Sequence, residues 1–295
     1  GTIDYYSGKR ENLLFDYTVP VGSQFLFNSV KANVGSVINE GLEIGLNYDL
    51  VKTNDLNIVL AGNFTTNKNT VDKLSGSVNV NGITTDLNTN YVSWGTGGTT
   101  GVASTNNGIS YLIEGQPIGT FWLFRHAGVD ANGNQLIEDV NKDGRIDDGN
   151  FQQGGIPNRD RVIAGQALPK FTYAFTPTIT YKNFDVNMVW RGVQGNKIYN
   201  ARRATLSALS QFGQTNVLRD ALEIGINNLD YATDYWLEDG SYLRFENLTI
   251  GYKIPIGNIK YISGIRASLT GNNLAVFTNY KGIDPELGFS GGNGF

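Results

Sequence analysis

The sequence has 295 residues, 40% of them apolar and 17% charged, and a formal net charge of −4 at pH 7. A chain this rich in apolar residues folds, and Lys and Arg that are scattered rather than clustered argue against a nucleic-acid partner. With no Cys, one His and one Met, the chain excludes a disulfide framework, thiolate metal ligation and a Cys nucleophile.

The composition favours β structure. Gly, Tyr and Phe are abundant, at 37, 15 and 15 residues, and aromatic residues suit strands while Gly suits turns. No stretch reaches the roughly 18 consecutive apolar residues of a transmembrane helix, and the opening "GTIDYYSGKREN" lacks the pattern of a secretory signal peptide. We therefore expect a soluble protein, or one that crosses a membrane as strands.

The first half of the chain contains one clear hairpin. After a strand candidate over residues 2–18, apolar residues occupy nearly every second position over residues 42–50 and again over 56–64, on either side of the short connection "VKTND". Alternation of this kind predicts two antiparallel strands, each with one apolar and one polar face.

Residues 66–170 are predicted to form one long connection. Its segment 71–110 is rich in Gly, Ser, Thr and Asn, which predicts an extended loop, and strands of its own are expected around "GTFWLF".

The stretch "EDVNKDGRIDDGN" inside this connection is the sharpest chemical motif. Oxygen-bearing residues at alternate positions, followed by Gly, copy the first half of an EF-hand loop, in which oxygen ligands converge on Ca²⁺. Position twelve, where a bidentate Glu normally closes the shell, is Asn150, so Asp147 or Asp148 would have to substitute. A structural Ca²⁺ within residues 139–150 and an ion-free Asx-rich turn both remain open. The candidate ligands are Asp139, Asn141, Asp143, Arg145, Asp147 and Asn150.

The second half repeats the hairpin pattern. Residues 171–181 and 184–190 alternate on either side of a tight "KN" turn, and residues 242–255 pair with a run that starts at Ile265. In the strand candidate that begins at Tyr242, Leu243 and Phe245 have the opposite phase to the apolar residues from Leu248 onward. This change of phase predicts a bulge near Asn247.

Residues 195–240 are a second long connection, and 199–224 is its best helix candidate. Short and long connections therefore alternate along the chain. A soluble sandwich does not require short and long connections to alternate, whereas an outer-membrane barrel has short periplasmic turns and long outer loops.

The barrel interpretation assigns a face to each set of residues. The polar set, which includes Thr172, Thr176, Asn187, Arg191, Arg266 and Thr270, would face the lumen or a plug. Tyr48, Tyr181, Phe184, Tyr252 and Tyr261 lie near the short connections, as in an interfacial girdle, although aromatic residues are common at the ends of any strand. The lipid-facing set is Leu42, Ile44, Leu46, Phe184, Val186, Met188, Leu248, Ile250 and Tyr252.

Aromatic residues in the outer segments are candidate contacts for a substrate or for a partner lipoprotein. They are Trp94, Tyr111, Trp122 and Trp236. The alternative is that they pack the loops onto each other.

Catalysis is not expected. The single His126 without Cys excludes most nucleophile–base arrangements, and no G-x-S-x-G, phosphate loop or His-based metal motif occurs. Adjacent carboxylates such as Asp147 and Asp148 point to opposite faces of a strand, which does not suit glycoside hydrolysis.

Four stretches, in this order, resemble the SusC/RagA-like TonB-dependent outer-membrane transporters. They are "NVGSVINEGLEIGLNYDLVKTNDLNIVLAGNFTTNKN", "EGQPIGTFWLF", "DVNKDGRID" leading to "ALPKFTYAFTPTITYKNFDVNMVWRGVQGNKIYN", and "SYLRFENLTIGYKIP" followed by "IRASLTGNNLAVFTNYKGIDPELG". Together they extend over nearly the whole chain.

The resemblance implies an all-β fold, part of a 22-stranded transmembrane barrel in the outer membrane of a Gram-negative bacterium. It implies that residues 1–295 are the C-terminal part of such a barrel, with 66–170 and 195–240 as extracellular loops. The implied partners are a SusD-like surface lipoprotein, outer-membrane lipid, and TonB through an N-terminal region absent from this chain. The implied function is import of glycan oligosaccharides or peptides.

Two alternatives remain at this point. A SusC-like barrel could serve as a structural subunit of a larger outer-membrane assembly. A secreted β-sandwich that binds carbohydrate would instead have a dry interior between two sheets.

Overall fold

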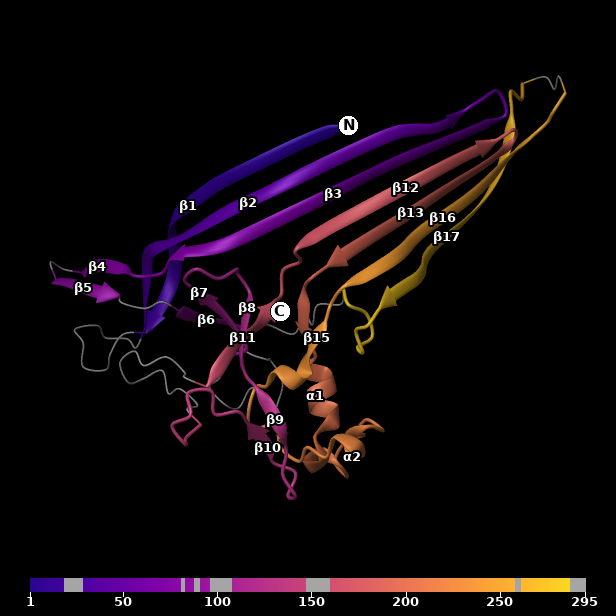
Figure 1. Cartoon of the computed structure of the whole chain (residues 1–295). Coiled ribbons are helices and arrows are strands. Elements are labelled where there is room, and N and C mark those ends of the chain that lie inside the picture. The colour runs from indigo at the N-terminus through magenta and orange to yellow at the C-terminus, as the bar shows by residue number, and fades with distance from the viewer. Residues whose placement is uncertain are drawn as a thin grey trace.

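The dominant element is one antiparallel sheet. The computed structural model describes residues 1–18, 29–80, 83–87, 91–95, 108–146, 160–257 and 261–286. Seven strands lie side by side in the order β1-β2-β3-β12-β13-β16-β17 (Figure 1), and each neighbouring pair is antiparallel. Their bounds are β1 Thr2–Thr18, β2 Ser29–Lys52, β3 Leu56–Lys73, β12 Phe171–Tyr181, β13 Phe184–Gln194, β16 Tyr242–Ile254 and β17 Ile265–Thr278.

Strands β2 and β3 are longer than their apolar alternation predicts. They have 24 and 18 residues, and the register runs without a break in pairing through the polar stretch that contains Asn67, Lys68 and Asn69. Backbone hydrogen bonds hold a strand whatever its side chains are, so the sheet continues where the apolar pattern stops. The predicted connection 66–170 therefore begins as a strand and not as a loop.

The bulge predicted near Asn247 is confirmed. Across β13 and β16, Val189 is opposite Asn247 but Trp190 is opposite Phe245, so Glu246 is the extra residue. The insertion restores the phase, and Phe245 comes onto the same face as Leu248.

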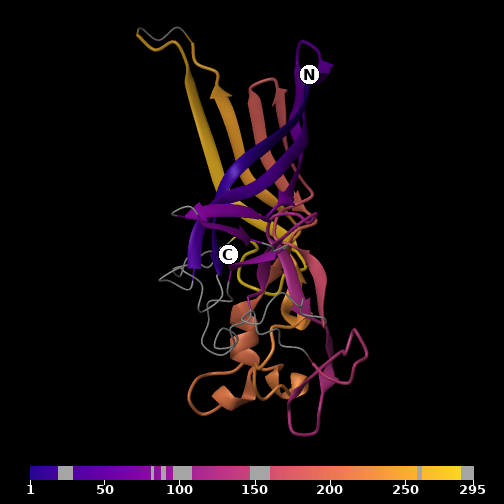
Figure 2. The ribbon, with the colours of Figure 1, turned by 90° about the vertical axis from the view of Figure 1, so that its left-hand side faces the viewer.

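The remaining described elements lie together at the end of the sheet away from the short turns, and we call them the outer region (Figures 1 and 2). A four-stranded sheet has the order β11-β8-β7-β6, and the pairs β4-β5, β9-β10 and β14-β15 form small ladders. Bounds are β4 Gly76–Val80, β5 Ile83–Leu87, β6 Tyr91–Gly95, β7 Ser110–Ile113, β8 Thr120–Phe124, β9 His126–Val129, β10 Gln135–Ile137, β11 Arg161–Gln166, β14 Lys197–Tyr199 and β15 Leu237–Asp239.

Two expectations for this region need correction. Segment 71–110 contains β4, β5 and β6 rather than an extended loop throughout. The single helix expected over 199–224 is two short ones, α1 (Ala201–Ser207) and α2 (Ala221–Ile224), with 3-10 turns η1 (Leu209–Gln211) and, further on, η2 (Asp234–Trp236). The backbone leaves the helical region at Ala208, where ψ is 116°, and Gly213 has φ +90°, so the apolar spacing cannot continue as one helix. Among the described residues, no helix is long and apolar enough to cross a membrane.

The main buried core of the described residues lies in the outer region and not behind the sheet. Trp236, Leu123 and Phe121 of this core come from η2 and β8. Ala204 of α1 packs into the same cluster. The long sheet thus leaves much of one apolar face uncovered.

Candidate functional site

The apolar face of the sheet contains all nine residues of the lipid-facing prediction. Phe184, Val186 and Met188 are directly opposite Tyr252, Ile250 and Leu248, and pairing through β3 and β12 puts the three residues from β2 in the same phase. Exposed fractions are 51% for Leu46, 52% for Phe184 and 42% for Ile250. The structure thus gathers the nine residues on one open face, and their contact with lipid stays a prediction.

Aromatic rings reinforce this face. Trp190 stacks on Phe245 with ring centroids 4.1 Å apart, and Phe184 meets Tyr252 at 4.5 Å. Tyr173 lies over Gly192, where a Cβ would overlap its ring, so the glycine makes room for the ring on the strand surface.

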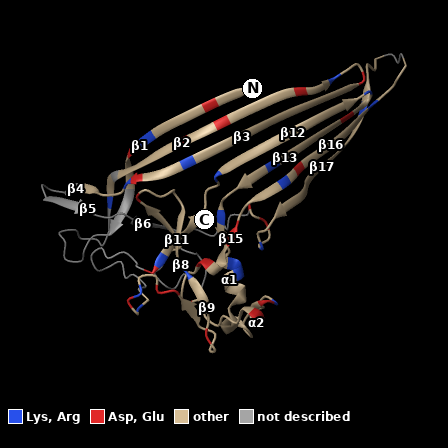
Figure 3. Cartoon of the chain, in the orientation of Figure 1, with Lys and Arg blue, Asp and Glu red and all other residues tan. Residues whose placement is uncertain are grey.

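The opposite face is polar. The Asn187 amide donates to the Thr178 hydroxyl over 2.9 Å, and the Thr249 and Thr270 hydroxyls lie 3.0 Å apart on neighbouring strands. Strand β12 has no charged residue and β17 has only Arg266 (Figure 3). The residues of the polar set predicted to face a lumen therefore share one face.

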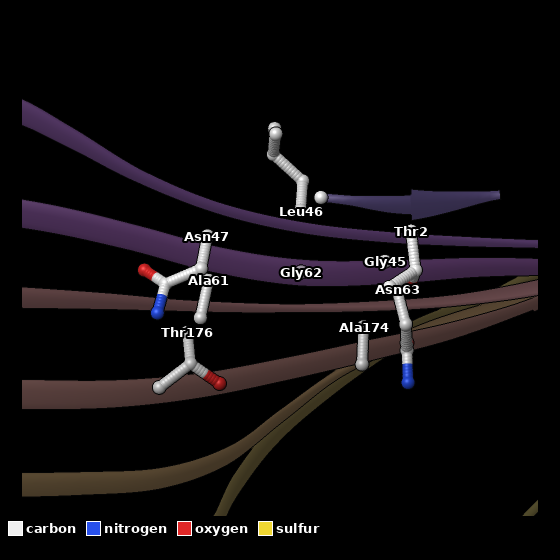
Figure 4. A pocket seen from close by; sticks show the side chains of 10 residues that line it. Thr2, Gly45, Leu46, Asn47, Ala61, Gly62, Asn63, Ala174 and Thr176 are labelled. Carbon is white, nitrogen blue, oxygen red and sulfur yellow. The ribbon is translucent and has the colours of Figure 1, made fainter.

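A hollow of about 490 Å³ opens along the polar side of β1, β2, β3 and β12. Small residues such as Gly45, Ala61 and Ala174 form its floor, with Asn47 and Asn63 beside them. In Figure 4 the side chains of both asparagines point to one side while Leu46, from β2, points to the other. The close view thus shows the two faces of the sheet directly.

One ion pair, between an arginine and an aspartate, crosses β16 on the polar face. Arg266 of β17 reaches Asp185 of β13 with two hydrogen bonds, of 3.0 and 2.5 Å. Gly251 lies between them, and a Cβ there would overlap the guanidinium. Only a residue without a side chain lets these two groups meet across the strand.

A second group of charges lies where the sheet meets the outer region. Arg191 of β13 donates to Glu246, over 2.6 Å, and to both carboxylate oxygens of Glu286. Arg244 of β16 donates to both oxygens of Asp284, over 2.7 and 2.8 Å. Its side chain is 6% exposed, so these charge-assisted bonds pair a nearly buried cation with a carboxylate.

The two carboxyls have pKa values below their ordinary range. Hydrogen bonding to Arg191 is the main cause for Glu286. For Asp284 burial is the largest influence and would raise the pKa, but the bonds from Arg244 and from the backbone N–H of Glu286 together outweigh it. Sequence reasoning missed this group because both carboxylates lie in "GIDPELG", far along the chain from the arginines that they meet.

The EF-hand-like stretch is an Asx-turn network over its described part, residues 139–146. Asp139 accepts from the backbone N–H groups of Asp143 and Gly144, over 3.2 and 2.7 Å, and Asn141 accepts from Asp143 over 3.0 Å. Asp143 in turn accepts from the N–H of Arg145 over 3.0 Å.

Asp147 and Asn150 of the candidate ligand set fall outside the described residues. Within the part of the chain that the structure describes, no three His, Cys, Asp or Glu side chains are grouped to hold a metal. Calcium binding here stays a prediction.

The four outer aromatic residues have different environments. Tyr111 and Trp236 have no exposed surface, so they pack the loops together and are not available to a substrate, which corrects the contact role for these two. Trp122 is partly exposed and meets Tyr111 edge-on, with centroids 5.3 Å apart. Trp94 lies in β6, and its side chain is outside the described part.

The single histidine, His126, makes packing and hydrogen-bond contacts within the outer region. The backbone N–H of His126 donates to Asp234 over 2.9 Å, and its ring lies 4.7 Å from that of Tyr235. Burial lowers the pKa of the imidazole, with Asp234 acting in the opposite direction.

An antiparallel sheet with one exposed apolar face, one polar face, short turns at one end and long connections at the other defines a segment of a transmembrane β-barrel wall. No family model matches the chain. TonB-dependent receptor P3 of Formosa agariphila is 30% identical over 313 residues, which cover 99% of this chain and 29% of that protein. TonB-dependent receptor SusC of Bacteroides thetaiotaomicron is 28% identical over 300 residues, which cover 97% and 28%.

A solved structure agrees in fold. The RagAB peptide importer in its closed-closed state matches with a TM-score of 0.71 and 24% identity, over 96% of this chain and 30% of that one. The sequence relatives confirm the resemblance to SusC/RagA-like TonB-dependent transporters, and the solved structure confirms the all-β barrel fold class. The chain spans a little under a third of the length of the curated relatives it matches.

Proposed function

We propose that this chain forms part of the barrel wall of a SusC-like, TonB-dependent transporter in the outer membrane of a Gram-negative bacterium. The protein would import large nutrients, either oligosaccharides or peptides, together with a SusD-like surface lipoprotein. TonB would act through a region outside this chain. A role without catalysis fits the relatives, which are named as receptors and transporters.

The uncovered apolar face carries this proposal. The seven strands form one sheet, and large side chains such as Leu46 and Phe184 are about half exposed on it. A β-sandwich would cover that face with a second sheet, which the described residues do not provide. Lipid is the solvent that such a face suits.

The test uses the complete protein in its source bacterium. Outer membranes are extracted in mild detergent, the intact mass of the species is measured, and copurifying proteins are identified. We expect a species several times heavier than this chain, accompanied by a surface lipoprotein. Uptake of labelled oligosaccharides or peptides should fall when the gene or TonB is deleted.

Two results would contradict the proposal. One is a soluble species with no membrane association. The other is wild-type uptake of every labelled nutrient in the deletion strain, with assembly factors in place of the lipoprotein, which would favour the structural-subunit alternative.

A further inference from the structure

Residues 278–286 begin at the last residue of β17 and form a short loop beside the end of that strand (Figure 1). Asp284 and Glu286 in this segment bind Arg244 and Arg191 on the polar face. The Tyr242 hydroxyl donates to Glu286 as well. One end of the segment is thus fixed to β13 and β16.

The other end of the segment is fixed to the outer region. The Thr278 hydroxyl donates to the carbonyl oxygen of Ser241 over 2.8 Å, and the backbone N–H of Lys281 donates to Glu238 over 2.8 Å. Glu238 lies in β15 and also accepts from the side chain of Asn200 over 3.2 Å. Asn200 is the N-cap of α1, so a continuous set of contacts joins the sheet, the segment and helix α1.

Polar contacts, more than buried apolar side chains, hold this segment in place. Ile283 is 79% exposed, and Tyr280 is partly buried. The side chains that anchor the segment to the sheet are two carboxylates, 27% and 29% exposed. Charge pairs that solvent reaches in part are weaker at high salt, whereas buried apolar contacts are not.

We propose that residues 278–286 are a releasable strap, which fixes the outer region against the polar face of the sheet through paired charges. When the strap opens, β15 and α1 lose a connection to the wall, and the outer region gains freedom to move. The use of that motion to admit cargo rests on the proposed transport function, but the strap itself does not.

Hydrogen exchange measured by mass spectrometry tests the strap in the complete protein, in detergent. The test variant carries Asp284→Asn and Glu286→Gln together. The matched control is Asp185→Asn, which removes a carboxylate from an arginine on the same face but leaves the strap unchanged. We expect amides of residues 279–286 to exchange at least about tenfold faster in the double variant, with faster exchange also at 237–241, and no change at either place in the control.

Unchanged exchange of the strap in the double variant would overturn the proposal, and so would strap amides that already exchange at the unfolded rate in the unmodified protein. If the double variant does not assemble, the unmodified protein is compared at about 0.05 and 1 M NaCl, since screening weakens paired charges. In that case, hydrogen exchange of the strap amides that does not depend on salt overturns the proposal. The readout needs no transport, so failure of the strap and failure of the proposed function are distinguishable.

Discussion

Replacing Ile250 by Lys tests which face of the sheet meets lipid. Ile250 lies between Val186 and Leu269 on the neighbouring strands and is 42% exposed. It is four residues from Ile254, where β16 ends at the short-turn side. At about 3.3 Å per residue and a tilt of about 45°, this corresponds to a depth of about 9 Å.

That depth sets the expected cost. The apolar band of such a barrel is about 25 Å tall, so Ile250 lies about three quarters of the way from the edge to the middle. Lys costs about 2–4 kcal/mol at the midplane and about 0–1 near the interface. We therefore expect Ile250→Lys to lower the free energy of unfolding by about 2 kcal/mol.

The assay is urea unfolding of the complete protein in phospholipid vesicles, with Thr249→Lys as the control on the polar face. The control should cost about 1 kcal/mol or less, from the lost contact with Thr270. Equal costs for the two variants would refute the assignment of faces. A soluble protein that unfolds in water on Ile250→Lys would point back to a sandwich.

Three further predictions concern the strap carboxyls, Gly251 and the EF-hand-like stretch. The strap carboxyls, with pKa values below their ordinary 3.8 and 4.5, stabilise the closed strap above those values and lose this effect as the pH falls through the lowered ones. A spin label on Ile283→Cys should therefore become mobile as the pH falls below the ordinary values, but should be mobile at pH 7 already in the neutralised double variant. Gly251→Ala should lower the urea midpoint because its Cβ displaces the Arg–Asp pair beside it, whereas Gly8→Ala, with open space around it, should not. If residues 139–150 bind Ca²⁺, then EDTA should speed hydrogen exchange there in the unmodified protein but not in Asp139→Asn. Exchange that EDTA leaves unchanged in both proteins would favour the alternative, an ion-free turn.

The hairpins could be predicted because their information is local. Alternation over 42–64 and 171–190 specifies two-faced strands, and the phase change at Phe245 was enough to locate a bulge. Strands β4, β5 and β6 could not be predicted, since each has five residues in a stretch rich in Gly, Thr and Asn. Pairing partners, and not the residues themselves, make these segments strands.

The charged group on the polar face shows a different limit. Arg191 could be assigned to the polar set from its phase, but its partner Glu286 is 95 residues away. No local pattern links two such positions. The same holds for Tyr111 and Trp236, whose burial depends on how the outer segments fold over each other.

The unequal strand lengths have a consequence for whatever covers the opening. The short turns are nearly level, since the N–H of Lys182 bonds to the carbonyl of Asp55, yet β2 has 24 residues and β13 has 11. At about 3.3 Å per residue and a tilt of about 45°, the difference amounts to about 30 Å in height. The rim of this part of the wall is therefore slanted, and a lid that seals it must rest on a high side and reach down to a low one.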